Sequence, residues 1–139
     1  MRHVRTIAAL LSLLGVVGSV HGQAGNPGIK VTVPFQFEIG KTTFSAGDYF
    51  IFSSSDKVWL QAASGRNVAV LFTGALSGKV PERDGKVVFN CYFGECFLSQ
   101  VWIAGQEAGR TLPRSKHQIE LEKTSAGEQF ALLGSKMQR

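Results

Sequence analysis

Residues 29–39 read Ile-Lys-Val-Thr-Val-Pro-Phe-Gln-Phe-Glu-Ile. Every odd-numbered position in this stretch is apolar, and Lys30, Thr32, Gln36 and Glu38 lie between those positions. Because successive side chains of a β-strand point to opposite faces, this period of two predicts a strand with one buried face. Pro34 falls on the other face and cannot donate to a strand ladder, so we expect the strand to lie at a sheet edge or to bend there.

The residues that follow predict further short strands. We expect strands at 48–54, 57–62, 67–73, 86–92 and 97–103, with Gly-, Ser- or Asp-containing turns between the earlier ones and a loop at 74–85. Strands at this regular spacing are typical of antiparallel folds. The sequence therefore predicts an all-β domain, an antiparallel sandwich or small barrel of about six to eight strands, with a short C-terminal helix or tail.

The composition changes after Ala104, and the segment 105–110 reads as a polar loop. Ser115 with Gln118 three places later resembles a capping box, which predicts a helix from 116 to about 123. Ile119 and Leu121 are two residues apart, a spacing that fits a strand equally well. From 124 to 139 we expect a loosely ordered tail, with at most a helical turn at 128–133, because little apolar surface is available to offset the ordering entropy.

The N-terminus has the layout of a secretory signal peptide. A short basic stretch at 1–5 is followed by an apolar run from Ile7 to Val20, which is shorter than the roughly 20 residues of a transmembrane helix. Val20 and Gly22 fit a cleavage site before Gln23. We therefore expect a signal peptide at 1–22, a linker at 23–28, a β-domain with a C-terminal helical segment at 29–123, and the tail at 124–139.

The charge argues against a nucleic-acid partner. The formal charge of +5 includes Arg2 and Arg5, and removal of 1–22 leaves 13 basic and 10 acidic residues, or about +3. The basic side chains of the β-domain are scattered among acids near turns, whereas a nucleic-acid site usually gathers them on one face. We expect no nucleic-acid binding and no stable membrane span after cleavage, and we place the protein in the periplasm or outside the cell.

The two cysteines flank the tetrapeptide Tyr92-Phe93-Gly94-Glu95. Opposed residues on either side of a hairpin loop can lie close enough for a disulfide, and export to an oxidising compartment favours one. We predict a structural Cys91–Cys96 bridge worth about 2 kcal/mol in the loop-entropy model. A redox or metal-binding pair is disfavoured, because the spacing is not C-x-x-C and no His is nearby in the sequence.

No catalytic, cofactor or metal site is predicted. His117 is the single histidine after residue 22, and a triad would require it to reach a nucleophile such as Ser99 and an orienting Asp. The carboxylates fall mostly at strand ends, where charge is normally solvated, so a glycosidase pair is disfavoured. The sequence has no P-loop, no H-E-x-x-H and no EF-hand ligand series.

Two stretches carry a family resemblance. They are Val31-Thr-Val-Pro-Phe-Gln-Phe-Glu-Ile-Gly40 with Ala46-Gly-Asp-Tyr49, and Phe97-Leu-Ser-Gln-Val-Trp102 with Gly109-Arg110 and Leu112-Pro-x-Ser115. The pattern resembles a family of small exported β-rich proteins that some environmental bacteria encode in many copies. The resemblance covers most of 29–121 and implies a β-rich exported domain, but it brings no activity, cofactor or catalytic residue. The family pattern has polar and aromatic residues in place of Cys91 and Cys96, so the disulfide is a departure from it.

The leading functional hypothesis is an exported non-enzymatic β-domain that binds a protein, a glycan or an envelope component. Such a domain should have a filled core and an exposed aromatic or apolar patch. An alternative is a small barrel that holds an apolar molecule among Phe35, Phe37, Phe50, Phe52 and Phe72, and a second is an enzyme with an unfamiliar site. Trp59, Trp102 and Arg110 are the candidate binding surface, although core and surface roles are commoner for these residue types.

Overall fold

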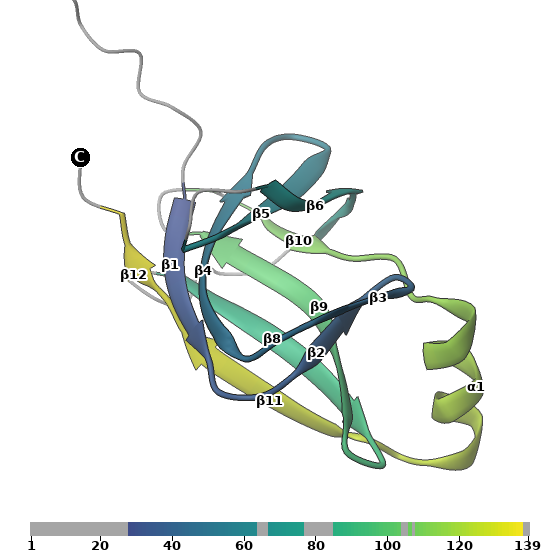
Figure 1. The fold of residues 1–139 in the computed structure, drawn as a ribbon. Coiled ribbons are helices and arrows are strands. Elements are labelled where there is room, and N and C mark those ends of the chain that lie inside the picture. The colour runs from purple at the N-terminus through teal and green to yellow at the C-terminus, as the bar shows by residue number, and fades with distance from the viewer. Residues whose placement is uncertain (1–27, 64–66, 77–84, 104–105, 107, 138–139) are drawn as a thin grey trace, which may run out of the picture.

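The computed structural model describes residues 28–63, 67–76, 85–103, 106 and 108–137. The expected signal peptide at 1–22 and most of the linker at 23–28 lie outside these residues. Strands dominate the described chain, which folds into two sheets and one short helix (Figure 1). The predicted all-β class with a short helix near the C-terminus is confirmed.

The first sheet has five antiparallel strands in the order β12-β1-β4-β5-β6. Their bounds are β1 Gly28–Val33, β4 Gly47–Ser53, β5 Lys57–Ala62, β6 Asn67–Phe72 and β12 Ser135–Lys136. The three central strands β1, β4 and β5 alternate between buried and more exposed residues, as the sequence predicted for a half-buried sheet.

The second sheet has seven strands and is mixed. Its main path is β11-β8-β9-β10-β7, and the β2–β3 hairpin adds to it through a parallel pairing of β2 with β9. The bounds are β2 Phe37–Ile39, β3 Thr42–Phe44, β7 Gly74–Leu76, β8 Gly85–Tyr92, β9 Glu95–Ile103, β10 Gly109–Thr111 and β11 Glu128–Leu133. Helix α1, Lys116–Thr124, lies between β10 and β11 in the chain.

At both edges of the fold the chain crosses from an edge strand of one sheet to an edge strand of the other. A single residue, Thr73, separates β6 from β7, and Gly134 separates β11 from β12. Strands that switch sheets at a bend form the corners of two-sheet β folds. The arrangement therefore combines features of both predicted architectures, since two packed sheets are joined at two corners.

Pro34 ends β1, and the chain crosses to the second sheet before β2 begins. The alternation continues through this bend: Ile29, Val31 and Val33 are buried in β1, and Phe37 and Ile39 are buried in β2. The predicted bend at Pro34 is confirmed. One period-two stretch thus supplies buried side chains to both sheets.

Aromatic rings fill the space between the sheets. The Phe37 ring stacks on Phe44 at 5.4 Å between centroids and meets Tyr49 and Phe89 edge-on at 5.2 and 5.5 Å. Phe35 packs against the same cluster and meets Phe89 at 5.0 Å. Five rings were expected to line a ligand cavity. Two of them, Phe35 and Phe37, pack into or against the core. Phe50 and Phe52 alternate with the buried Tyr49 and Ile51 and therefore face outward, and the side chain of Phe72 lies outside the described part of the chain.

The structure differs from the sequence prediction in its short and polar strands. Strand β11 occupies 128–133, where a helical turn in a loosely ordered tail was expected, and it pairs with β8 at six positions. Strand β10 lies partly in the expected polar loop at 105–110, and β7 opens the expected loop at 74–85. Each of these strands is held by backbone hydrogen bonds to a neighbouring strand. Such pairing leaves no hydrophobic periodicity in the sequence, so the pattern could not predict it. Together with β3 and β12 they raise the strand number above the six to eight expected.

We predict that Gly134→Ala destabilises the fold by about 1–3 kcal/mol, as overpacking in a rigid core does. A Cβ at this buried corner would lie 2.7 Å from Ile29 Cδ1 and 3.1 Å from Ile29 Cβ. Ile29 is 1% exposed, so a shift of its side chain would disturb the packing of the core around it. Urea unfolding followed by tryptophan fluorescence gives the free energy of unfolding. The control is Ser135→Ala at the exposed neighbouring position, and equal stability of the two variants would contradict the prediction.

Candidate functional site

The β8–β9 hairpin ends in a two-residue turn, Phe93-Gly94. Both residues have positive φ, 51° and 83°, as the type I′ hairpin turn requires. Tyr92 and Glu95 pair across the strands, so the four-residue loop expected between the cysteines is shorter by two residues. The turn therefore projects a phenylalanine at the tip of the longest pair of strands.

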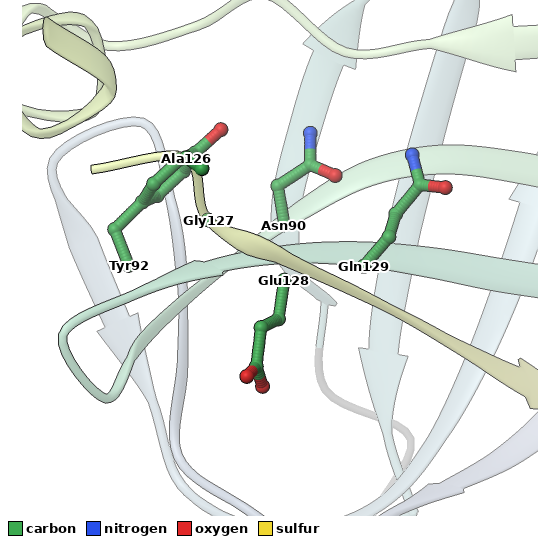
Figure 2. A pocket seen from close by; sticks show the side chains of 6 residues that line it. All are labelled: Asn90, Tyr92, Ala126, Gly127, Glu128 and Gln129. Carbon is green, nitrogen blue, oxygen red and sulfur yellow. The ribbon is translucent and has the colours of Figure 1, made fainter.

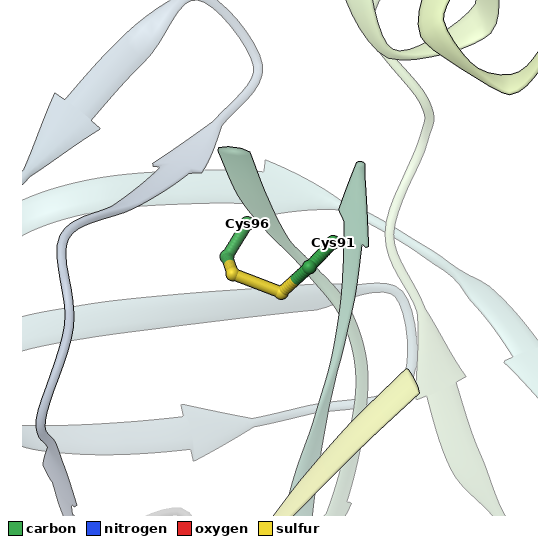
Figure 3. Close-up of a disulfide and its surroundings, with 2 residues drawn as sticks. All are labelled: Cys91 and Cys96. Carbon is green, nitrogen blue, oxygen red and sulfur yellow. A yellow bond between two sulfur atoms is a disulfide. The ribbon is translucent and has the colours of Figure 1, made fainter. Parts of the chain in front are cut away.

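The predicted disulfide is confirmed. Cys91 and Cys96 are paired in register, with a Sγ–Sγ distance of 2.02 Å, and the bridge spans the two strands just behind the turn (Figure 3). Cys91 belongs to the buried core and Cys96 packs against it. The bridge is structural, because it fixes the base of the turn to the core.

Helix α1 begins beside this hairpin. The Ser115 hydroxyl accepts the backbone N–H of Gln118 at 3.1 Å, which confirms the predicted N-terminal cap. Further along the helix, Glu122 accepts hydrogen bonds from the Tyr92 hydroxyl at 3.2 Å and from Arg114 Nη1 at 2.7 Å. These contacts hold the helix against strand β8.

The first turn of the helix brings His117 to two glutamates. His117 Nε2 lies 2.5 Å from Glu95 Oε2, and Glu38 completes a cluster whose nitrogen and carboxylate atoms all lie within 4.8 Å of one another. Glu38 comes from β2, Glu95 from the start of β9 and His117 from the helix. Three separate segments thus converge on one small volume.

Pairing and packing fix the position of Glu38 in this cluster. Glu38 is in parallel register with Phe97 of β9, and its neighbours Phe37 and Ile39 point into the core. Phe97 is 2% exposed, and its ring lies 6.0 Å from that of His117. Glu38 is therefore directed away from the core, toward the helix.

The electrostatic environment of Glu38 is unfavourable to its charge. Its Oε2 atom is buried and has no hydrogen-bond partner. Burial raises the pKa of Glu38 above its ordinary value of 4.5, the negative charge of Glu95 raises it further, and His117 acts in the opposite direction. Glu38 is thus the least exposed member of the cluster and is half-buried, whereas the side chains of Glu95 and His117 are 46% and 55% exposed.

Sequence reasoning missed this cluster, since it predicted no metal site and placed no histidine near the cysteines. The three residues are far apart in the chain, and each has an ordinary local setting: Glu38 and Glu95 lie in strands and His117 lies at a helix start. The one available signal was the capped helix at 115, because it made His117 a first-turn residue. Nothing in the sequence showed which hairpin that helix would approach.

A largely apolar groove lies beside the Phe93-Gly94 turn, and Glu128 also borders it. It measures about 520 Å³ and lies between the turn and the start of β11, with Phe93, Phe130, Ala126 and the disulfide among its walls. Phe93 is 72% exposed and Phe130 is 44% exposed. We call Phe93, Phe130, Ala126 and the Cys91–Cys96 bridge the tip surface.

A smaller polar hollow of about 230 Å³ borders the same strands. Figure 2 shows the amides of Asn90 and Gln129 directed to one side of β11 and the carboxylate of Glu128 to the other. Asn90 already donates to Ser99 Oγ at 3.1 Å. The hollow is lined by amide groups and by the phenol of Tyr92, and Glu128 also borders it.

The structure does not bring Trp59, Trp102 and Arg110 together. Trp59 lies on the outer face of β5, where Phe52 stacks beside it at 5.5 Å and Lys57 Nζ lies 5.3 Å from its ring. Trp102 belongs to the other sheet, is 8% exposed and packs on the backbone of Gly109. Arg110 pairs with Val101, which faces the core, so Arg110 points to the face opposite Trp102.

Comparisons of the chain with protein-family models, with curated proteins and with solved structures find no match. Within the described residues, no helix has the length and apolarity needed to cross a membrane.

We predict that Phe93→Asn stabilises the protein by about 0.5–1 kcal/mol. A left-handed backbone disfavours phenylalanine, whereas Asn-Gly is the preferred type I′ pair, and the exposed ring contributes little to the core. Thermal unfolding measures the change. Phe93→Ala is the matched control, because it removes the ring but keeps the backbone cost. An Asn variant no more stable than the Ala variant would disprove this account of the turn.

Proposed function

We propose that the chain is an exported, non-enzymatic binding domain that holds a protein partner in the cell envelope or outside the cell. The partner contacts the tip surface, with an apolar side chain seated in the groove beside Phe93. The observation that carries this proposal is Phe93 itself, a large apolar side chain that is 72% exposed in a left-handed turn position.

Folding alone gives no reason for phenylalanine at this position. The backbone conformation disfavours it, and its exposed ring buries little apolar area. Backbone outliers of this kind concentrate at binding sites, where the surrounding structure holds them in place. The disulfide and the paired strands supply that support here, because they fix both ends of the turn.

The character of the groove favours a protein over a glycan. Two exposed phenyl rings, an alanine and the disulfide line it, with Ser125 and Glu128 beside them, and aromatic anchors in apolar pockets dominate protein interfaces. Trp59, the more accessible tryptophan, is less suited to stacking on a sugar, because Phe52 and Lys57 already occupy its surroundings. The core rings Phe37 and Phe89 pack on one another, which disfavours an apolar ligand held inside the fold.

Export rests on the signal-peptide pattern at 1–22 and is supported by the disulfide, since disulfides persist mainly in oxidising compartments. In a bacterial host that expresses the full chain, we expect the protein in the periplasm or the medium with Gln23 as its first residue. Cell fractionation followed by intact-mass measurement tests this. Recovery of the uncleaved chain from the cytoplasm would contradict export.

Site-specific photocrosslinking tests the binding function. With p-benzoylphenylalanine at position 93 in the native host, we expect a discrete adduct with one protein, because this side chain would lie within the interface. The same group at Ser55, an exposed position in the turn between β4 and β5, is the matched control and should give no such adduct.

A second variant separates binding through the tip surface from chance proximity. Phe130→Thr removes the other exposed ring of the groove and should greatly reduce the adduct from position 93, while circular dichroism shows an intact fold. Equal adducts from positions 93 and 55, an adduct that contains a glycan in place of a protein, or no adduct from position 93 would each overturn the proposal.

A further inference from the structure

The cluster of Glu38, Glu95 and His117 shares no residue with the tip surface and has the donor set of a metal site. It offers one imidazole nitrogen and two carboxylates, with donor atoms that all lie within 4.8 Å of one another. From this geometry we propose that the cluster binds one Zn²⁺ ion. The inference is independent of the proposed partner-binding function.

The donor types favour zinc among common divalent ions. Zn²⁺ takes nitrogen and carboxylate ligands in tetrahedral sites, whereas Ca²⁺ and Mg²⁺ prefer six or more oxygen ligands and seldom use imidazole. Three protein ligands leave the fourth position to water or to an exchangeable ligand. Both cysteines are in the disulfide, so within the described residues no thiolate competes for the ion.

The buried oxygen of Glu38 is a separate observation that points to a cation. Glu38 Oε2 has no hydrogen-bond partner although it is shielded from solvent, and a second carboxylate, Glu95, lies close to it. An unpaired buried polar atom is costly, and two neighbouring carboxylates repel one another. A divalent ion bound by both carboxylates would remove both penalties.

The side chains need only small movements to bind zinc. Zn–N and Zn–O bonds of about 2.0–2.2 Å in a tetrahedron place donor atoms about 3.3 Å apart. The 2.5 Å separation of His117 Nε2 from Glu95 Oε2 would increase by about 0.8 Å, and the widest separation, 4.8 Å at most, would decrease by about 1.5 Å. The ion would replace the hydrogen bond between His117 Nε2 and Glu95 Oε2.

The backbone that carries each ligand is fixed. Glu38 is held between Phe37 and Ile39, whose side chains lie in the core, and Glu95 adjoins the disulfide. His117 lies in the first turn of a capped helix, with its ring against Phe97. Preorganised ligands of this kind lower the entropic cost of binding.

Two surface hollows border the cluster. One surface hollow of about 390 Å³ is lined by Glu38 and Glu95, and a second of about 380 Å³ is lined by Glu38 and His117. Lys41 and Lys116 also line the second hollow. Their positive charges and the exposure of Glu95 and His117 weaken binding, so we expect a lower affinity than that of a closed structural zinc site.

Isothermal titration calorimetry with ZnCl₂ on the purified, untagged chain tests the proposal. We expect saturable binding that weakens at least about tenfold in each of Glu38→Gln, Glu95→Gln and His117→Gln. Glu120→Gln is the matched control, because Glu120 is an exposed acid on the same helix that pairs with Lys123 at 3.0 Å, outside the cluster. This variant should bind like the wild type.

Thermal unfolding is the second readout and guards against variants that fold poorly. Zinc should raise the melting temperature of the wild type and of Glu120→Gln but not that of His117→Gln, which alters an exposed side chain. Zinc binding that is undiminished in His117→Gln would place the ion elsewhere and overturn the proposal. Absence of saturable binding to the wild type up to about 1 mM zinc would overturn it as well.

Discussion

The packing of Phe37 between the two sheets is the constraint on which most of the structure depends. Its ring contacts Phe44 of β3, Tyr49 of β4 and Phe89 of β8, and so joins the β2–β3 hairpin to both sheets. Because neighbouring residues in a strand face opposite ways, burial of Phe37 directs Glu38 outward. Glu95 of the β8–β9 hairpin and His117 of helix α1 approach Glu38 on this outer side. Glu38 Oε2 is therefore shielded from solvent although the side chain lies outside the core. An apolar contact thus determines where the acidic side chain lies.

The sequence predicted those parts of the fold that have a local physical signal. The alternation at 29–39, the bend at Pro34, the cysteine pair and the Ser115 cap each depend on residues within a few positions of one another. Strands β10 and β11 were missed because pairing partners hold them, and β11 is mostly exposed on both faces and shows no alternation. The candidate site was harder still. Glu38, Glu95 and His117 meet only through the parallel pairing of β2 with β9 and the placement of the helix, and neither leaves a pattern in the chain.

The β8–β9 hairpin separates two chemically different surfaces. Gly94 and Cys96 border both the apolar groove and one of the hollows beside Glu38. One side offers phenyl rings and the disulfide with Glu128 beside them, and the other offers two carboxylates and an imidazole. The disulfide at the base of the turn limits independent movement of the two surfaces, because Phe93 and Glu95 both lie within the ring that it closes. A partner that changes the position of the turn would therefore also move Glu95 relative to His117.

The pairing of β12 with β1 determines how the domain can be joined to other chains. Ile29 lies opposite Lys136, so the two ends of the described fold leave it side by side. Strand β11 runs from Cys91 back to Lys86 along β8, which places those ends one strand length from the turn at Phe93. A domain with adjacent ends tolerates insertion into another protein and circular permutation. Insertion at these ends would leave the hairpin turn at the far end of the domain, away from the protein that carries it.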